Sequence, residues 1–370
     1  MATTPQLLGI SLPKDQYLHS TTPADPIGAP TEWWWHIGTL TSADHARTFG
    51  FEINATSMSS FGFTQIEITD VGNKRNYQKV TPVFPMPPNW AESEPDRPWY
   101  VRLGGSTSTS DDGAVSMQTI DGNALHMNVE ATFVDVPAST PHAPTPCKLS
   151  LQLYQEGAPL LVWGSGCREI NPSGHTDLTR CNFYYSLTRL RASGVLNIGS
   201  EQVQVEGLTW MDHEYGAFGE GTTGSKRGSG DLKWTLQDMQ LSNGVHLSNF
   251  TTPGEMPKED KPMESNATLL WPDGHSTFMK TTTTPRGPCY VSAKNVTYFL
   301  TYQVDIAFGR TECSLTVTSL FPDQLFRDGE GAADIYEGVA SCDGVMPASE
   351  ALGSPVNIVS GTAWIEQSLG

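Results

Sequence analysis

Apolar and polar residues alternate along much of this chain. In residues 125–133 every second residue is apolar and the residues between them are polar, and residues 149–153 and 300–306 repeat the pattern. A period of two places apolar side chains on one face of a β-strand and polar ones on the other. The chain is therefore predicted to be rich in β-strands with one buried face.

Short turn sequences separate these predicted strands. Small, glycine-containing segments at 192–194, 242–244, 272–274 and 308–310 lie between candidate strands, as in β-hairpins. No amphipathic helix longer than about two turns is visible, and 26 prolines and 35 glycines disfavour a helical protein. The predicted fold class is all-β, with two antiparallel β-barrel or curved-sheet domains packed together.

The chain length supports two domains. With 370 residues the chain is longer than one hydrophobic core usually supports. The turn-rich stretch 193–207 precedes a second unusual motif, so the boundary is predicted there. The expected domains are residues 1–205 and 206–370.

The charge and hydropathy of the chain exclude two kinds of partner. The formal net charge is −18, and the two basic pairs, at 74–75 and 226–227, are isolated in loops. Nucleic-acid binding requires a basic stripe that displaces counterions, so a nucleic-acid partner is not expected. No apolar run approaches the roughly 20 residues that span a bilayer, so no membrane span is expected.

Cysteines and glycosylation sequons leave the compartment open. The six cysteines have wide, unequal spacings without a CxxC pair, and disulfides remain open. Sequons at Asn54, Asn249, Asn266 and Asn295 favour a glycoprotein of the secretory route whose signal peptide has been removed. The first residues lack the apolar core of a signal peptide, so a cytoplasmic protein with accidental sequons is the alternative.

The first motif that could carry chemistry is EWWWH at residues 32–36. On an extended strand Trp33 and Trp35 point to one face, and Glu32 and His36 point to the other. Some of these rings then face a cavity or a second layer. The alternative interpretation is structural, with the tryptophans as ordinary barrel core.

The second motif is LTWMDHEYG at residues 208–216. Alternation directs Asp212 and Glu214 to one face and His213 to the other, which gives paired carboxylates suited to general acid and base work. A carboxyl group in an aromatic pocket has a raised pKa and can donate a proton near neutral pH. The alternative is structural: a buried cluster of salt bridges and hydrogen bonds that joins the two halves.

Other strands contribute candidate pocket residues. Residues 182–186, which include Tyr185, and residues 233–240, which include Trp234 and Gln237, carry aromatic rings and amides suited to a mixed pocket. They are equally consistent with ordinary alternating strands. No HxH, HExxH, GxSxG, GxGxxG or GKS/T pattern occurs, so no metal, nucleotide cofactor or serine nucleophile is predicted.

The two motifs resemble those of a known family. EWWW at 32–35 with FGFE at 49–52, and WMDHEYG at 210–216, are similar to the lipocalin-like family of carotenoid 1,2-hydratases, bacterial AttH-type proteins, fungal kievitone hydratase and fungal Diels–Alderases. Residues 336–338 and 361–366 look like that family's closing strands. The resemblance implies two lipocalin-like domains, a pocket near their junction and no organic cofactor.

The resemblance implies one of two chemistries. A hydratase protonates an isoprenoid alkene with Asp212 or Glu214, and an indole face of Trp33, Trp35 or Trp234 stabilises the cation. A pericyclase orients a diene over its partner and donates a hydrogen bond to a developing oxyanion. His213, Tyr185 or Gln237 is the expected donor in that reading.

We predict a cofactor-free pericyclase of fungal secondary metabolism, of the Diels–Alderase or hetero-Diels–Alderase type. A hydratase acting on a prenyl double bond is the alternative, and a non-catalytic terpenoid carrier is the third reading. The expected substrate is a small hydrophobic terpenoid, prenylated phenolic or polyketide; the oligomeric state is left open. The expected catalytic residues are Glu32, Asp212, His213 and Glu214. The expected substrate-binding residues are Trp33, Trp35, His36, Glu52, Tyr185, Trp234 and Gln237.

Overall fold

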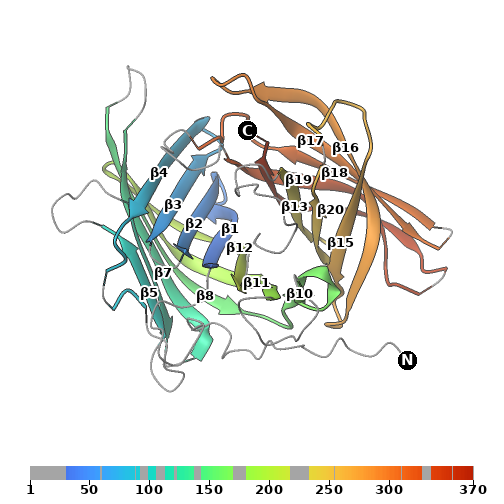
Figure 1. The fold of residues 1–370 in the computed structure, drawn as a ribbon, viewed down its shortest axis with the longest axis horizontal. Coiled ribbons are helices and arrows are strands. Elements are labelled where there is room, and N and C mark those ends of the chain that lie inside the picture. Colours follow the sequence, from blue (N-terminus) through green and yellow to red (C-terminus); the bar gives the residue numbers. More distant parts are fainter. Residues whose placement is uncertain are drawn as a thin grey trace. The chain divides into compact units, whose positions relative to one another are not determined.

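A computed structural model gives the structure of residues 31–58, 61–87, 89–91, 99–105, 113–120, 123–136, 143–169, 181–216, 233–253, 255–309, 311–326, 335–351 and 353–369. These residues form β-strands β1 to β20 and one short 3-10 turn, η2 (Val162–Gly164). They divide into an N-terminal unit, residues 31–157 and 165–216, and a C-terminal unit, residues 158–164 and 233–369. Figure 1 shows both units as antiparallel β-structures. The predicted all-β class with two barrel or curved-sheet domains is confirmed.

The N-terminal unit is one strongly curved sheet. Its strands run in the order β4-β3-β2-β1-β12-β11-β8-β7-β6-β5, and β10 pairs with β11. Contacts of β5 with β2, β3 and β4 bring the two ends of this path together, so the sheet is nearly closed. The strands are β1 (Thr31–Ser42), β2 (Thr48–Met58), β3 (Phe61–Asp70), β4 (Arg75–Val83), β5 (Tyr100–Gly104), β6 (Ala114–Ile120), β7 (Asn123–Asp135), β8 (Thr145–Gln155), β10 (Cys167–Glu169), β11 (Cys181–Ile198) and β12 (Glu201–Gly216).

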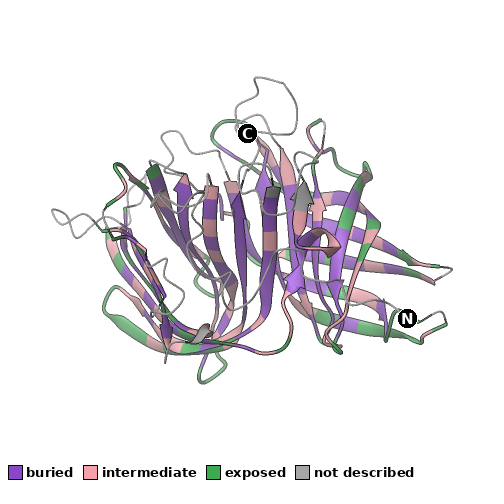
Figure 2. Ribbon diagram, turned by 60° about the horizontal axis from the view of Figure 1, so that its bottom comes forward, coloured by how far each residue is buried: buried purple, intermediate pink, exposed green. Residues whose placement is uncertain are grey.

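The two halves of this sheet are buried differently. In β5, β6 and β8 buried and more exposed residues alternate, as the sequence pattern predicts. In β2, by contrast, all residues except the first and last are buried, and most of β3 is buried on both faces (Figure 2). The polar residues of β2 and β3 are therefore buried too, although their alternation with apolar residues suggests a solvated face.

The C-terminal unit is a closed barrel of eight strands in sequential order, β13 to β20. Its inner face holds a hydrophobic core that includes Met239, Leu269, Tyr302 and Ile365. The short strand β9 (Leu160–Leu161) and η2 pack against β15. The barrel strands are β13 (Trp234–Leu241), β14 (His246–Thr251), β15 (Met263–Leu270), β16 (Ser276–Val291), β17 (Thr297–Phe308), β18 (Thr311–Ser319), β19 (Ile335–Pro347) and β20 (Val356–Ser368).

The strand pairing bears on the domain boundary. β12 pairs along its length with β11 and β1, so all of it belongs to the N-terminal unit. The boundary expected between residues 205 and 206 falls inside this strand. The next described residues after 216 begin at residue 233, and these belong to the C-terminal unit.

The fold also bears on the sequons and cysteines. Asn54 and Asn249 are fully buried within strands, so the fold leaves no room for a glycan on either. Asn266 and Asn295 are exposed. All cysteines whose side chains are described, namely Cys147, Cys167, Cys289, Cys313 and Cys342, are free thiols. No helix within the described ranges is long and apolar enough to cross a membrane.

Candidate functional site

The two sequence motifs lie side by side in the N-terminal sheet. β1 pairs with β12, and Trp33, Trp34 and Trp35 stand directly opposite Glu214, His213 and Asp212, respectively. Since side chains of directly opposite residues share a face, the motifs separate into two sets. We name them the Trp34 face, with Glu32, Trp34, His36 and His213, and the Asp212 face, with Trp33, Trp35, Asp212 and Glu214.

On the Trp34 face, His213 is held by three side chains. Its Nδ1 lies 2.9 Å from the Tyr185 hydroxyl, and its Nε2 lies 3.0 Å from Oε1 of Glu32. The Trp34 indole stacks on the imidazole with a centroid distance of 4.9 Å. All four side chains are fully buried. A neutral imidazole that donates from Nε2 and accepts at Nδ1 satisfies both contacts.

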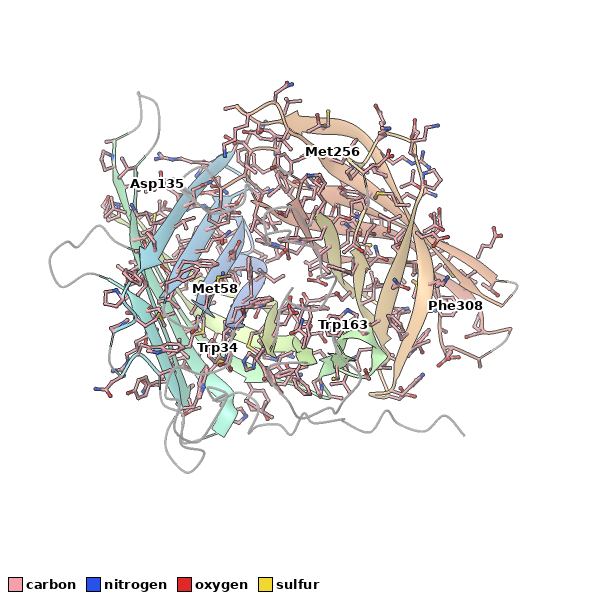
Figure 3. All side chains as sticks on the ribbon, viewed as in Figure 1. Trp34, Met58, Asp135, Trp163, Met256 and Phe308 are labelled. Atoms are coloured by element: carbon pink, nitrogen blue, oxygen red, sulfur yellow. The ribbon has the colours of Figure 1, made fainter. Side chains whose placement is uncertain are left out.

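Two further tryptophans pack against Trp34. The ring centroids of Trp99 and Trp90 lie 5.9 and 6.3 Å from that of Trp34, which is labelled in Figure 3.

His36, two residues after Trp34 on β1, is fully buried, and neither of its ring nitrogens has a hydrogen-bond partner among the described residues. Burial, and the nearby His213 to a smaller extent, lowers the pKa of His36 to about 3. This imidazole is therefore neutral at physiological pH.

On the Asp212 face, Asp212 is a buried carboxyl with several hydrogen-bond donors. Its Oδ1 accepts from Ser186 Oγ at 2.5 Å and from Trp210 Nε1 at 2.7 Å. Burial raises the pKa of Asp212 to about 6, although the hydrogen bonds from Ser186, Trp210 and Tyr184 act in the opposite direction. Desolvation of the charged form outweighs those bonds, so the carboxyl can hold a proton near neutral pH.

The neighbours of Asp212 combine a second carboxylate with aromatic rings. Glu214 follows two residues along the same face and accepts a hydrogen bond from the Asn182 side chain. Asp212 and Glu214 are 5% and 4% exposed, whereas Trp33, Trp35 and Tyr184 are partly exposed. The two buried carboxyl groups therefore share a face of the sheet with aromatic side chains that are partly exposed.

A second pair of acidic residues lies on the Asp212 face of β2 and β3. Glu52 and Glu67 stand directly opposite each other, and both are fully buried. Oε1 of Glu67 accepts a hydrogen bond from Thr69 Oγ1 at 3.0 Å. Asn54 lies two residues after Glu52 on the same face of β2 and stands directly opposite Trp35. The Asp212 face thus carries a buried polar band across adjacent strands.

Comparison with known proteins identifies the family. A family model described as AttH-like matches residues 106–367. The chain belongs to the AttH-like family. A comparison with curated protein sequences gave no match.

Solved structures similar to this AttH-like chain share its fold over almost the full length. A Nitrosomonas europaea protein described as an AttH has a TM-score of 0.67 and 17% identity, covering 100% of this chain and 99% of the other. Kievitone hydratase from Nectria haematococca has a TM-score of 0.63 and 15% identity, with 96% and 97% covered. CghA has a TM-score of 0.52 and 12% identity, with 100% and 96% covered.

The structure distributes the predicted site residues of this AttH-like chain over three places. Glu32, His36, Tyr185 and His213 are on the Trp34 face. Trp33, Trp35, Glu52, Asp212 and Glu214 are on the Asp212 face. Trp234 and Gln237 are on β13 of the C-terminal barrel, where Trp234 donates to Glu366 and Gln237 accepts from Asn249. Among the described residues no three His, Cys, Asp or Glu side chains form a metal-binding group.

The sequence did not identify Trp210 and Ser186 as hydrogen-bond donors to Asp212. Trp210 lies two residues before Asp212, so the period of two within the motif carries enough information to place it on the same face. Ser186 is different, because its place opposite Asp212 depends on the register of β11, which shifts between Leu187 and Leu190. A β-bulge of this kind leaves no clear signal in a single sequence.

Proposed function

We propose that this AttH-like protein is an enzyme that adds water to a prenyl-type double bond, with Asp212 as the proton donor. The supporting observation is a buried carboxyl group whose pKa is raised to about 6 and whose neighbour across the sheet is Trp35. A general acid is most effective when its pKa lies near the working pH. A kievitone hydratase with the same fold agrees with this chemistry.

The proposed reaction proceeds by protonation and hydration. Asp212 transfers its proton to the less substituted alkene carbon, and the double-bond electrons form the new C–H bond. The tertiary cation that results is stabilised by the indole faces of Trp33 and Trp35. Water then forms the C–O bond and gives its extra proton to Glu214. Ser186 and Trp210 both donate to Oδ1 of Asp212 and so hold the carboxyl group in place.

The remaining polar groups have structural and orienting roles in this proposal. Tyr184 and Asn182 hold Asp212 and Glu214 on one face of the sheet. Glu32, Tyr185 and His213 lie on the opposite face, so we assign them to stabilising the β1–β12 pairing rather than to proton transfer. His213 is then a positioning residue that fixes the strand carrying both carboxyl groups.

The experiment follows the oxygen atom. The protein is incubated in H₂¹⁸O with a phenol that carries a dimethylallyl group, and the product is analysed by mass spectrometry. The proposal expects a tertiary alcohol, 20 mass units heavier than the substrate, with ¹⁸O on the tertiary carbon. A product without solvent oxygen, or a product formed equally well by Asp212→Asn, contradicts it.

The pericyclase reading remains a second candidate because a neutral carboxyl is also a hydrogen-bond donor. Protonated Asp212 would polarise a carbonyl of one reaction partner while Trp33 and Trp35 hold the other partner in place. The likeness of the two motifs to those of fungal Diels–Alderases supports this candidate, and CghA has the same fold. In this case the product is an isomer of the substrate or the sum of two substrates, and it contains no ¹⁸O. A carrier returns the ligand unchanged.

A further inference from the structure

The last hairpin of the C-terminal barrel extends beyond the strand next to it. β19 and β20 pair with each other over their whole length. β13 pairs with β20 only as far as Gly361, and beyond that point the backbone N–H of Ser242 donates to the carbonyl of Ser360 at 2.7 Å. Residues 356–359 of β20 therefore have β19 on one side and no described strand on the other.

The backbone of this segment is directed outward at two residues. Successive residues of a strand direct their N–H and C=O groups to alternate sides. Ser360 bonds to Ser242 on the open side, so Ile358 and Val356, which follow the same alternation, direct their groups to that side too. Within the described ranges no backbone group pairs with them there. We call residues 356–358 the β20 edge.

The side chains of the β20 edge are exposed and uncharged. Ile358 is 90% exposed, which is the highest value among large apolar side chains of the described residues, and Val356 is 45% exposed. Residues 356–361 include no Asp, Glu, Lys or Arg. Natural edges are commonly protected by charged side chains or by bulges, and the β20 edge has neither. Such an edge is suited to pairing with another strand.

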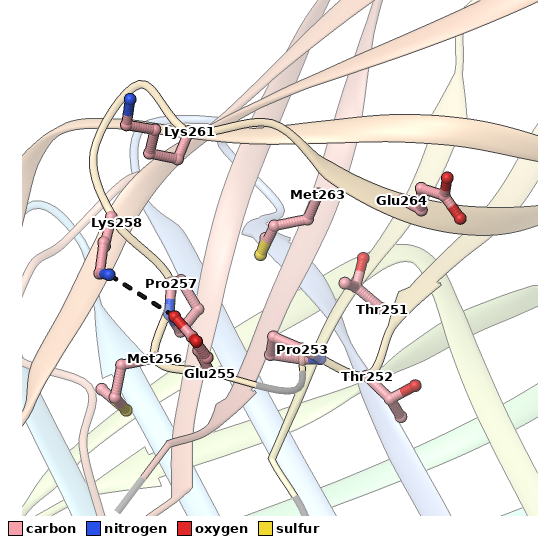
Figure 4. A pocket seen from close by; sticks show the side chains of 10 residues that line it. All are labelled: Thr251, Thr252, Pro253, Glu255, Met256, Pro257, Lys258, Lys261, Met263 and Glu264. Atoms are coloured by element: carbon pink, nitrogen blue, oxygen red, sulfur yellow. Dashed lines mark ion pairs between the residues drawn. The ribbon is translucent and has the colours of Figure 1, made fainter.

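The opposite end of the same barrel is charged. β14 leads away from the turn at Ser242, and its connection to β15 lines a pocket of about 460 Å³ (Figure 4). The lining includes two lysines and two glutamates, and Lys258 pairs with Glu255 at 3.6 Å. The uncharged apolar edge is therefore a feature of one end of the barrel and is separate from this pocket.

The hairpin that carries the β20 edge is held in place. In the loop between β19 and β20, Oε2 of Glu350 accepts from Oγ1 of Thr277 at 2.9 Å and lies 2.9 Å from Nε2 of His275. Met346 and Val359 pack in the barrel core. Because these contacts already order the hairpin, a partner strand does not have to bear that cost when it binds.

We propose that the β20 edge pairs with the β20 edge of a second copy of this chain, antiparallel, across a two-fold axis at Asn357. Val356 of each copy stands opposite Ile358 of the other, and each of these two pairs forms two backbone hydrogen bonds. The apolar side chains of both copies share one face of the joined sheet. A second copy fits because the donors and acceptors of the edge complement themselves under this rotation. The contact does not depend on the reaction proposed for Asp212, since it lies in the other unit.

The size and charge of the contact set its strength. Pairing stops after three residues in each copy, because Ser360 is already bonded to Ser242. Such a contact buries roughly 500–800 Å², which is below the about 1,200 Å² of stable complexes. Each chain also has a net charge of −18, which opposes association. The dimer is therefore transient, with a Kd of roughly 0.1–1 mM.

Sedimentation equilibrium of the full-length protein, from about 0.02 to about 0.5 mM, measures this association. The average mass should rise with concentration, and the Kd should fall at least three-fold when NaCl is raised from about 0.05 M to about 0.5 M, because salt screens the repulsion. Ile358→Lys places like charges across the contact and should raise the Kd at least ten-fold. Val291→Lys, at a 52% exposed position where β16 ends, is the matched control and should leave the Kd unchanged. A monomer under all conditions, or equal effects of both variants, overturns the proposal and would assign the edge to a different partner.

A cysteine cross-link tests the register. Opposite residues of the type that Asn357 forms with its copy have Cα atoms about 4.5 Å apart, which is within the range of a disulfide. In a Cys289→Ser background, which removes the exposed native thiol, Asn357→Cys should give a disulfide-linked dimer under mild oxidation. Ser360→Cys is the control, because residue 360 is also exposed but lies about 20 Å from its copy in this register. Equal cross-linking at both positions, or none at Asn357→Cys, contradicts the pairing.

Discussion

Trp35 of β1 and Asp212 of β12 are directly opposite partners in the N-terminal sheet. Side chains in such positions have Cβ atoms about 5 Å apart, so the indole lies beside the carboxyl group. Trp35 is partly exposed, whereas Asp212 is 5% exposed. In the proposed reaction, the acid and the cation-stabilising surface thus come from two segments that are far apart in the sequence.

Asp212→Asn should abolish most product formation with little change in the fold. The asparagine carbonyl can still accept from Ser186 and Trp210, but its amide cannot donate a proton to an alkene. Loss of a general acid typically reduces the rate by about 10²–10⁴. The measurement is kcat with a prenylated phenol. Since the acid acts in its protonated form, the wild-type rate should also fall as the pH rises through about 6.

Asp343→Asn is the control for this variant, because Asp343 is an exposed aspartate of the C-terminal barrel. It should have the wild-type rate and the wild-type pH profile. A wild-type rate that increases between pH 6 and 8 would show that the ionised form of Asp212 is the active one, and the acid role would have to be abandoned.

The same carboxyl predicts a pH-dependent stability. The folded pKa of about 6 is above the ordinary aspartate pKa of 3.8, so the folded state binds more protons than the unfolded state between these values. The stabilisation of the folded state by protonated Asp212 is about 3 kcal/mol. It is therefore fully present below pH 3.8 and is lost as the pH rises through 6. Asp212→Asn should lack this loss and become more stable relative to wild type between pH 4 and 7. Urea unfolding across this range measures the difference, and parallel stability curves for the two proteins would refute it.

The sequence alone predicts the strand content and the face of the strand to which each side chain of the two motifs points. Alternation alone predicts that Asp212 and Glu214 share one face while His213 points to the other, and the β1–β12 register agrees. It could not show which strands pair, so the contact of Ser186 with Asp212 was not predicted. Nor could it show that Glu52 and Glu67 are buried, because a polar residue between apolar ones has the same pattern whether its face is solvated or covered.

Trp35→Leu should reduce the rate while leaving the protein folded. Leucine keeps an apolar side chain beside Asp212 but removes the aromatic face, which is worth roughly 0.5–2 kcal/mol to a nearby cation. We expect kcat to fall by about two- to thirty-fold, whereas Trp35→Phe should retain more of the activity. Steady-state kinetics of the two variants gives the comparison. If leucine and phenylalanine have the same effect, the ring face has no role in the rate.

The Glu32–His213–Tyr185 arrangement should contribute to stability. Glu32→Ala leaves the buried Nε2 of His213 without its carboxylate partner and is expected to cost about 2–3 kcal/mol. Tyr185→Phe removes the hydroxyl at Nδ1 and should cost about 1–2 kcal/mol. The two effects should not be additive, because both bonds involve the same imidazole. Urea unfolding of both single variants and the double variant measures the coupling. Tyr154→Phe, at a half-exposed position, is the control.

His36→Leu should make the protein more resistant to acid. His36 is buried without a hydrogen-bond partner among the described residues, and its folded pKa of about 3 is below the ordinary histidine pKa of 6.5. Between these values the unfolded state binds more protons, so the wild type loses stability as the pH falls below 6.5, by up to about 5 kcal/mol near pH 3. Leucine cannot take up a proton and leaves no unpaired nitrogen. Its melting temperature should exceed that of the wild type at pH 7, and the difference should grow at pH 5. The exposed His45 serves as the control, since His45→Leu changes no buried group. A difference between His36→Leu and wild type that is constant from pH 7 to pH 5 would mean that His36 is not the group that titrates.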